Sequence, residues 1–297
     1  MASNFNRALS DTFIKDLQPE KQGWWPDVLA DPKLLIALRG KYLNVYWRGQ
    51  SLFCVNSGIT ATIHQKYLMD PKLDSQVRLK DGKFDTTLLA NGFIREYEGP
   101  ETLAKLKKAA GLFSGLEKTG CHEIAVRNPG VVDCEIAFPG KVSLDDGGGD
   151  KLAPRIDLAA FEDDGDAVRL VFWEAKHFSN SELRAANGPA PVVRQIGIYR
   201  KYLSENRTAI EGSYQKIAKN LVAIGNMGWK RELSPLINEV ATGKRRLTLG
   251  AEPKVGLIIF GFDSAQRDHS GWKGHRDALK KQIKDIIITG DAKNIRL

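Results

Sequence analysis

The sequence has few cysteines and no long apolar run. Its 297 residues include only three cysteines, Cys54, Cys121 and Cys134, which lie far apart. Three distant thiols offer neither a disulfide framework nor a Cys-x-x-Cys zinc or redox pair, which fits a reducing compartment. The amino terminus MASNFNRALSDTF lacks the apolar run of a signal peptide, and the other apolar stretches are only as long as strands. We therefore expect a cytoplasmic protein with no membrane partner.

Several catalytic motifs are missing as well. The five histidines show no His-Glu-x-x-His spacing, and the sequence contains neither Gly-x-x-x-x-Gly-Lys-Ser/Thr nor Gly-x-Ser-x-Gly. These absences exclude the usual zinc-protease, nucleotide-driven motor and serine-hydrolase sites. If a motor acts with this protein, a helicase or ATPase partner chain must supply it.

The charge of the chain is uneven. The formal net charge is +8, and it divides into +2 over residues 1–100, −4 over residues 101–190 and +10 over residues 191–297. A basic segment attracts polyanions such as nucleic acids, but solvated helix faces produce the same excess of lysine and arginine. With 42% hydrophobic residues, the chain can bury a core of its own, as one large domain or two of ordinary size.

Residues 1–99 are predicted to form an N-terminal α+β domain that could bind substrate or a partner. Strand-like segments at 41–47 and 51–55 flank the turn residues Arg48, Gly49 and Gln50, which predicts a hairpin. A further strand is expected near residues 92–98. The sequence Glu-Gly-Pro at 98–100 marks the expected boundary, so that residues 100–297 form the second domain.

From residue 101 onward the pattern predicts an α/β fold. Apolar residues at intervals of three and four predict one amphipathic helix from Glu101 to about Glu117. The elements expected after it are strands at 131–138, 155–161 and 167–173, helices at 192–203 and 210–224, a strand at 255–262 and a helix near 273–288. This order implies a mixed central sheet flanked by helices.

Two acids and a lysine lie on the second and third of these strands. The tripeptide Asp/Glu-x-Lys occurs six times, but only Glu174-Ala175-Lys176 ends an apolar strand that follows another strand carrying an acid, Asp157. Side chains alternate along a strand, so Glu174 and Lys176 share a face. If the two strands pair as antiparallel neighbours, Asp157 lies opposite the end of the second one.

Two convergent carboxylates suit a hard, oxygen-preferring cation. Such a pair binds Mg²⁺ and leaves coordination positions for water and for a phosphate oxygen. The ion lowers the pKa of a bound water and offsets the charge that builds on the phosphorus. Lys176 is expected to orient the water or to stabilise the phosphate. This is the chemistry of phosphodiester hydrolysis, and Mn²⁺ can take the place of Mg²⁺ in it.

The sequence here resembles a known family. The segments PRIDLAAF and VRLVFWEAK are similar to the signature of the PD-(D/E)XK nuclease superfamily, with Asp157 as the isolated acid, Glu174 as the second acid and Lys176 as the lysine. The helix–strand–strand–strand–helix–strand order also resembles the common core of that superfamily. One departure is that Ile156 rather than proline precedes the first acid, with Pro154 two positions earlier. The resemblance implies a restriction-endonuclease-like fold.

The helix after this signature carries a second motif. Gln195 and Tyr199 are four residues apart on one helix face, shortly after Lys176. They resemble the Gln-x-x-x-Tyr motif of the RecB-like branch, which implies that both side chains lie beside the metal and the nucleic acid. A surface glutamine followed by a packed tyrosine gives the same pattern by chance. Three cysteines are too few for the iron–sulfur members of that branch, which need four thiolates.

A glutamate from the first helix often joins the site in this superfamily. Glu117 extends the apolar series of the predicted helix by four residues, which directs its carboxylate toward the sheet. A buried carboxylate is costly without a partner such as a metal ion or a lysine. A solvated Glu117 at a frayed helix end is the alternative, and Glu101 and Glu123 are rival candidates.

The basic end of the chain supplies candidate phosphate contacts. In the last predicted helix the cations recur at intervals of three and four residues, opposite an apolar face. The sequence Gly-Lys-Arg-Arg at 243–246 is a second basic cluster, and a solvated face is the alternative for both. The candidate nucleic-acid-binding residues are Lys273, Arg276, Lys280, Lys284, Lys244, Arg245 and Arg246.

The leading hypothesis is a Mg²⁺-dependent DNA endonuclease. The expected catalytic residues are Asp157, Glu174, Lys176, Gln195, Tyr199 and Glu117, and the expected metal ligands are Asp157, Glu174 and the carbonyl of Ala175. The resemblance implies DNA as substrate and a role in restriction, phage defence or repair. An RNA substrate and a homodimer both stay open. The alternative is a catalytically silent nucleic-acid-binding or assembly module on the same fold.

Overall fold

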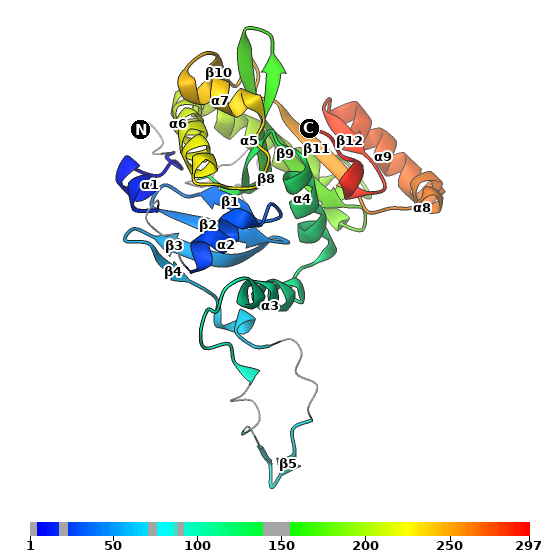
Figure 1. The fold of residues 1–297 in the computed structure, drawn as a ribbon. Helices are drawn as coiled ribbons and strands as arrows, with labels where there is room; N and C mark the ends of the chain where they lie inside the picture. The colour runs from blue at the N-terminus through cyan, green and yellow to red at the C-terminus, as the bar shows by residue number, and fades with distance from the viewer. Residues whose placement is uncertain (1–4, 18–22, 71–75, 86, 88–91, 139–154) are drawn as a thin grey trace.

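A mixed β-sheet forms the centre of the fold. The computed structural model describes residues 5–17, 23–70, 76–85, 87, 92–138 and 155–297, and within these ranges the sheet has six strands. They are β7 (Val131–Ala137), β8 (Arg155–Asp164), β9 (Ala167–His177), β10 (Arg246–Thr248), β11 (Val255–Phe260) and β12 (Ile286–Ile288). The order is β12-β11-β9-β8-β7, and β10 pairs with the start of β9 (Figure 1). Strands β8 and β9 pair as antiparallel neighbours, which is the condition under which Asp157 lies opposite the end of β9, and β11 runs parallel to β9.

Helices cover both faces of this sheet (Figure 1). On one face α4 (Leu116–Arg127) packs Ile124 against Leu158 and Trp173. On the other face lie α5 (Pro191–Glu205) and α6 (Arg207–Asn226), where Tyr214 meets Phe172 edge to face at 5.8 Å. The other helices after residue 99 are α3 (Pro100–Gly111), η3 (Ser181–Leu183), α7 (Pro235–Thr242), α8 (Ser264–Asp268), α9 (Ser270–Gln282) and η4 (Ala292–Asn294). In the described part of the chain, every helix is too short or too polar to cross a lipid bilayer.

The helix predicted from Glu101 to Glu117 is in fact two helices. α3 ends at Gly111 and α4 begins at Leu116. The apolar periodicity fails between them, because Leu112 and Phe113 are 73% and 49% exposed and do not reach the core. Glycines at 111 and 115 flank this segment and lower its helix propensity. Glu117 therefore lies in the first turn of the second helix and not at the end of the first.

Two other predicted elements are wrong. The last helix, α9, ends at Gln282, and the three consecutive isoleucines 286–288 form β12, which pairs with β11. Isoleucine is β-branched and packs well in a strand, so these residues complete the sheet edge. Lys284 consequently lies beyond the helix. Residues 92–98 do not form a strand either, apart from a single bridge between Met69 and Phe93.

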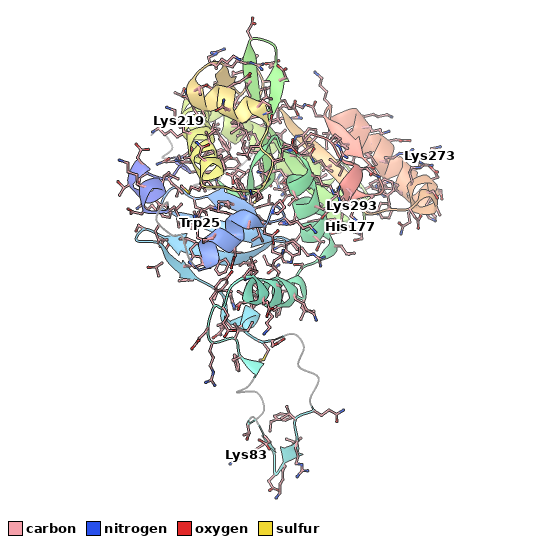
Figure 2. All side chains as sticks on the ribbon, in the orientation of Figure 1. Trp25, Lys83, His177, Lys219, Lys273 and Lys293 are labelled. Carbon is pink, nitrogen blue, oxygen red and sulfur yellow. The ribbon has the colours of Figure 1, made fainter. Side chains whose placement is uncertain are left out.

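The N-terminal part of the chain builds a second, antiparallel sheet. Its strands are β1 (Leu35–Leu38), β2 (Tyr42–Trp47), β3 (Gln50–Asn56) and β4 (Thr60–Thr62), and α1 (Asp11–Leu17), α2 (Trp24–Ala30) and η1 (Gln65–Tyr67) flank them. The predicted hairpin of β2 and β3 is confirmed. Its turn is Arg48-Gly49, with φ of 48° and 72°, as a type I′ turn requires, and Gln50 already belongs to β3. The small hairpin of β5 (Leu79–Lys80) and β6 (Lys83–Phe84) projects away from both sheets (Figures 1 and 2).

The two sheets share one buried core. Trp25 and Val45 belong to the same cluster of buried apolar residues as Leu106 and Phe172. A buried ion-pair network also links the layers, because Asp133 of β7 pairs with Arg7 and Arg39 at 2.6 and 2.8 Å. The helix α3 begins at Pro100, directly after the predicted boundary, and buried residues from both sides of that boundary belong to this core.

Candidate active site

Strands β8 and β9 separate at Asp157. The ladder between them ends at the pair Leu158 and Trp173, and the next outward-facing amide of β9, that of Ala175, donates to Asp157 Oδ2 at 2.8 Å. The carboxylate of Asp157 therefore takes the place of a backbone carbonyl of β8 as the acceptor for this amide. In a strand, the N–H and C=O of one residue point toward the same neighbouring strand. The carbonyl of Ala175 consequently faces the same gap as the Asp157 carboxylate.

Glu174 and Lys176 lie side by side at the end of β9, as the sequence predicts. Lys176 Nζ is 2.8 Å from Glu174 Oε1 and 2.6 Å from Glu182 Oε2. Glu174 is 2% exposed and Lys176 6%, whereas the side chain of Glu182, in η3, is 44% exposed. The lysine therefore bridges a buried carboxylate and one at the surface.

Burial dominates the electrostatics of the two acids. It raises the pKa of Asp157 to about 7, although the Ala175 amide and the Lys176 ammonium both act in the opposite direction. Burial and the neighbouring Asp157 raise the pKa of Glu174 well above its usual range. Burial disfavours the charged form of Lys176 too, but Glu174, Glu182 and Asp157 together outweigh it and raise the pKa of the lysine. The two carboxylates repel each other and share a need for positive charge.

The oxygen atoms of this site suit a hard divalent cation. Glu174 Oε2 is buried and accepts no hydrogen bond, and the same holds for Gln195 Oε1. An oxygen buried in this way needs a donor or a cation. In the described part of the chain, no three His, Cys, Asp or Glu side chains form a ligand set. Asp157 and Glu174 supply two carboxylates. This is enough for Mg²⁺, which ordinarily binds one or two protein carboxylates and completes its coordination shell with water and phosphate oxygens.

Gln195 and Tyr199 of α5 form a pair beside the acids. Gln195 Nε2 donates to Tyr199 Oη at 2.7 Å, and Tyr199 Oη donates to the carbonyl of Arg155. Tyr199 is 1% exposed, and burial together with Glu174 and Asp157 raises the pKa of its hydroxyl. The tyrosine anchors α5 to the start of β8, and the glutamine leaves an acceptor oxygen without a partner.

Glu117 reaches the end of β9 from the first turn of α4. Its Oε2 accepts from the backbone amide of His177 at 3.0 Å and from Asn180 Nδ2 at 2.7 Å. Of the three glutamates considered, it is the one that contacts β9. Glu101 is exposed in the first turn of α3, and Glu123 pairs with Arg127 at 2.9 Å.

Glu135 was not predicted, yet it lies beside the site. The register of β7 with β8 pairs Cys134 with Leu158 and Ile136 with Ile156, so Glu135 lies opposite Asp157. Its φ is 51°, a left-handed conformation that is costly for a residue with a side chain, and its negative charge helps to raise the pKa of Asp157. A single glutamate inside an apolar run gives no indication, in the sequence alone, that its side chain lies beside Asp157.

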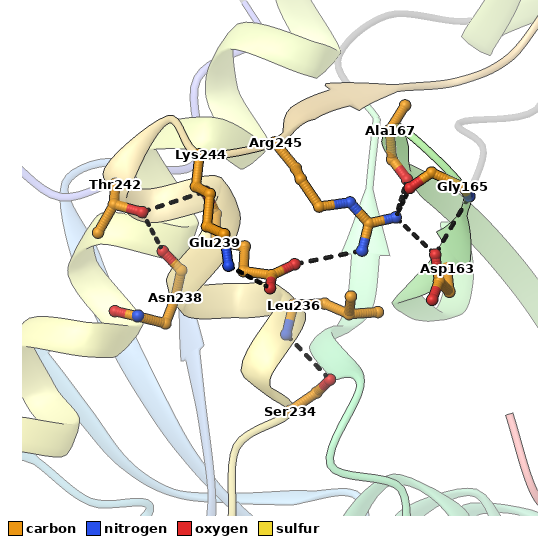
Figure 3. A network of polar contacts seen from close by, with 10 residues as sticks. All are labelled: Asp163, Gly165, Ala167, Ser234, Leu236, Asn238, Glu239, Thr242, Lys244 and Arg245. Carbon is orange, nitrogen blue, oxygen red and sulfur yellow. Dashed lines mark hydrogen bonds and ion pairs between the residues drawn. The ribbon is translucent and has the colours of Figure 1, made fainter.

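The basic cluster at 243–246 is engaged in the fold and lies away from the acids. Arg245 Nη2 donates to Asp163 Oδ1 at 2.5 Å and its Nη1 to Glu239 Oε2 at 3.2 Å (Figure 3). Lys244 Nζ lies 3.4 Å from the same Glu239. Arg246 is exposed on β10. The cluster pins the tip of the β8–β9 hairpin to α7, and Arg245, a candidate phosphate contact, already pairs with two acids of the fold.

This cluster and the acids lie at opposite ends of β9. Arg246 pairs with Ala167, the first residue of β9, and Glu174 lies seven residues further along. At ~3.3 Å per residue the separation is about 23 Å.

The cations predicted on the last helix are dispersed. Lys273 and Lys280 are exposed on α9, and Lys284 is exposed beyond its end. Arg276 lies mostly covered, with its Nε 3.2 Å from Asp277. Among the described residues, none of these cations forms an ion pair with the acids at the end of β9. The helix α9 itself contacts η3 and packs Trp272 against Phe178, just beyond β9, with ring centroids 5.1 Å apart.

Comparisons of the chain with protein-family models, with characterised proteins and with solved structures found no match.

Proposed function

We propose that this protein is a metal-dependent nuclease that hydrolyses phosphodiester bonds in DNA. The observation that carries the proposal is the end of β9, where buried Glu174 is paired with Lys176 while its second oxygen has no partner, next to Asp157. The order α4-β7-β8-β9-α5-β11 and the resemblance to the PD-(D/E)XK signature point to the same chemistry.

Each residue of the site has a role in this proposal. Asp157, Glu174 and the carbonyl of Ala175 would hold Mg²⁺ or Mn²⁺. When bound, the ion neutralises phosphate charge and lowers the pKa of a coordinated water. Lys176 orients the attacking water and balances the negative charge that develops on the phosphate, because its ammonium lies at the acids and is held by Glu182 from outside.

The neighbouring side chains hold this arrangement in place. Glu117 fixes the backbone of His177, the residue directly after the lysine, and so sets the end of β9. Tyr199 ties α5 to the first residue of β8, and Gln195 offers its free oxygen to a water or to the substrate. We expect these three residues to tune the rate and not to carry the chemistry.

The test is cleavage of supercoiled and linear DNA by the purified protein. We expect cleavage with Mg²⁺ or Mn²⁺ and none with EDTA. Lys176→Ala should abolish it, and Lys219→Ala, an exposed lysine on α6, should cleave like the wild type. Equal cleavage by the wild type and Lys176→Ala would refute the proposed site.

A catalytically silent nucleic-acid-binding module is the second candidate. The observation that favours it is the double ion pair of Lys176, since an ammonium held by two carboxylates is less free to assist a reaction. DNA binding without cleavage of DNA or RNA under any metal would support this alternative. Cleavage of RNA alone would instead change the substrate and keep the site.

A further inference from the structure

A cleft of about 1160 Å³ opens on the face of the sheet that α4 covers. We call it the α4 cleft. Its walls come from three distant parts of the chain: α4 itself, the N-terminal layer with Lys33 and Trp47-Arg48, and the C-terminal segment 290–293. Its floor is the end of β11 with Gly261, where φ is 88° and a Cβ would lie 2.2 Å from the ring of His177. None of the predicted phosphate contacts lines this cleft.

The α4 cleft adjoins the hollow that Glu117 lines, since Leu116 and His177 belong to both. His177 lines it and follows Lys176 directly in β9. The backbone amide of His177 is held by Glu117, which lines the adjoining hollow together with His177. Figure 2 shows His177 close to Lys293, at the mouth formed by the C-terminal segment. Glu117 is therefore the residue of the candidate site that borders the cleft. Glu174 and Lys176 lie on the other face of β9, because side chains alternate along a strand and Ala175 packs on the α4 side.

The charge of the lining fits a polyanion. Four cations line the cleft, Lys33, Arg48, Arg127 and Lys293, against the two acids Glu123 and Asp291. Glu123 is already neutralised by Arg127, and the Asp291 carboxylate accepts from the backbone amide of Lys293 as the N-cap of η4. Lys33 and Lys293 are exposed, and within the described ranges neither ammonium forms an ion pair. Their charge is available to phosphate groups.

A buried acceptor in the lining also lacks a partner. His122 is 6% exposed, and its Nε2 lies 2.9 Å from the carbonyl of Lys33. A carbonyl can only accept, so Nε2 carries the proton and Nδ1 is an acceptor. Nδ1 is buried and receives no hydrogen bond. This unmet acceptor lies next to the indole of Trp47, whose ring centroid is 5.5 Å from that of the imidazole.

We propose that the α4 cleft binds the nucleic-acid strand on one side of the scissile phosphate, with successive phosphates at Lys33 and Lys293. This inference rests on the proposed nuclease function and deepens it. It assigns the N-terminal layer a direct part in substrate binding through Lys33 and Arg48. It also moves the main phosphate contacts from α9 and the 243–246 cluster to the side chains that line the α4 cleft.

The test measures affinity and cleavage separately. A fluorescein-labelled 20-nucleotide single strand and the matching duplex are titrated with full-length protein in EDTA, which prevents metal-dependent cleavage. The variants are Lys33→Ala/Lys293→Ala and the control Lys216→Ala/Lys219→Ala, which removes the same charge from α6, where Figure 2 shows Lys219 far from Lys293. Lys33→Arg/Lys293→Arg retains the charge and should bind like the wild type.

We expect the cleft variant to bind at least about tenfold more weakly than the control at ~0.1 M salt, and the salt slope of log affinity to flatten by about 1.4 to 1.8. If Lys33→Ala/Lys293→Ala and the α6 control have equal melting temperatures, equal affinities and equal salt slopes, the proposed role of the cleft is wrong. Parallel assays with Mg²⁺ keep the two proposals apart. If the protein cleaves DNA but its affinity does not depend on Lys33 and Lys293, the proposed role of the cleft is refuted and the nuclease function is not. If binding depends on the cleft but no cleavage occurs, the nuclease function is refuted and the role of the cleft is not.

Discussion

Asp133 and Glu174 are both buried carboxylates in the central sheet, but their surroundings are opposite. Asp133 is 4% exposed and receives bonds from Arg7, Arg39, Tyr214 and the backbone amide of Cys134. Although burial disfavours its charge, the two arginines hold its pKa below the usual range. Glu174 is 2% exposed, has one cationic partner and one bare oxygen, and its pKa is raised.

Under the proposed function, the difference separates a carboxylate that holds the fold together from one that binds a metal ion. A buried charge whose every oxygen is bonded stabilises one arrangement of the chain. A buried carboxylate with an oxygen that accepts no hydrogen bond remains unfavourable until a donor or a cation binds to that oxygen. The Arg245 cluster follows the first pattern and the end of β9 follows the second. Three substitutions test this reading, and the largest expected effect is given first.

Glu174→Gln should abolish function and leave the fold intact. The amide keeps the shape of the side chain and removes one buried negative charge, so we expect cleavage to fall by about 10³-fold or more while the free energy of unfolding changes by less than about 1 kcal/mol. Single-turnover cleavage and urea unfolding measure the two quantities. A large loss of stability with this variant would mean that Glu174 is structural, like Asp133.

Asp133→Asn should destabilise the fold and leave the cleavage activity of the folded protein unchanged. The change leaves the guanidinium groups of Arg7 and Arg39 buried without their counter-charge, and breaking a buried pair in this way costs about 3 to 5 kcal/mol. We expect a lower urea midpoint, with cleavage per folded molecule unchanged at low temperature. An unfolding midpoint equal to that of the wild type would contradict the contrast between the two carboxylates.

His122→Gln should flatten the stability of the protein between pH 7.5 and pH 5. Burial lowers the pKa of His122 to about 4, whereas an unfolded histidine titrates near 6.5. Below pH 6.5 the unfolded chain binds the proton more tightly than the folded one, so stability falls as the pH drops. The expected loss is about 2 kcal/mol by pH 5, and it should be absent in the variant.

Urea unfolding of the wild type and His122→Gln at both pH values measures this difference. Other titrating groups are common to the two proteins and cancel in the comparison. A wild type and a variant with the same pH dependence would show that the pKa of His122 does not change on folding.

Sequence patterns predicted the centre of the fold because each central element has a distinct apolar period. The continuous run at 255–260 became a strand buried along its whole length, and the alternation around Glu174 predicted its contact with Lys176. The predictions failed where the period was ambiguous. The three isoleucines of β12 fit a helix face as well as a strand, and two exposed apolar residues suggested a helix through 112–113.

The parts of the site that sequence patterns missed depend on backbone geometry and long-range contacts. Glu135 comes next to Asp157 through the β7–β8 register and a left-handed residue, and neither has a sequence signature. Glu182 reaches Lys176 from a turn of only three residues. The ion pair of Arg245 has no sequence signature either, because its partner Asp163 is 82 residues away in the chain.

The arginines that hold Asp133 also set an order of assembly. Arg7 and Arg39 precede their shared partner by 126 and 94 residues. During synthesis, the N-terminal layer therefore leaves the ribosome well before the carboxylate that neutralises it, and Tyr214 follows later still. When only the first hundred or so residues have been made, Arg7 and Arg39 still lack Asp133, the carboxylate with which they are buried in the folded protein. The layer becomes a finished structure only when the strand that carries Asp133 has been made.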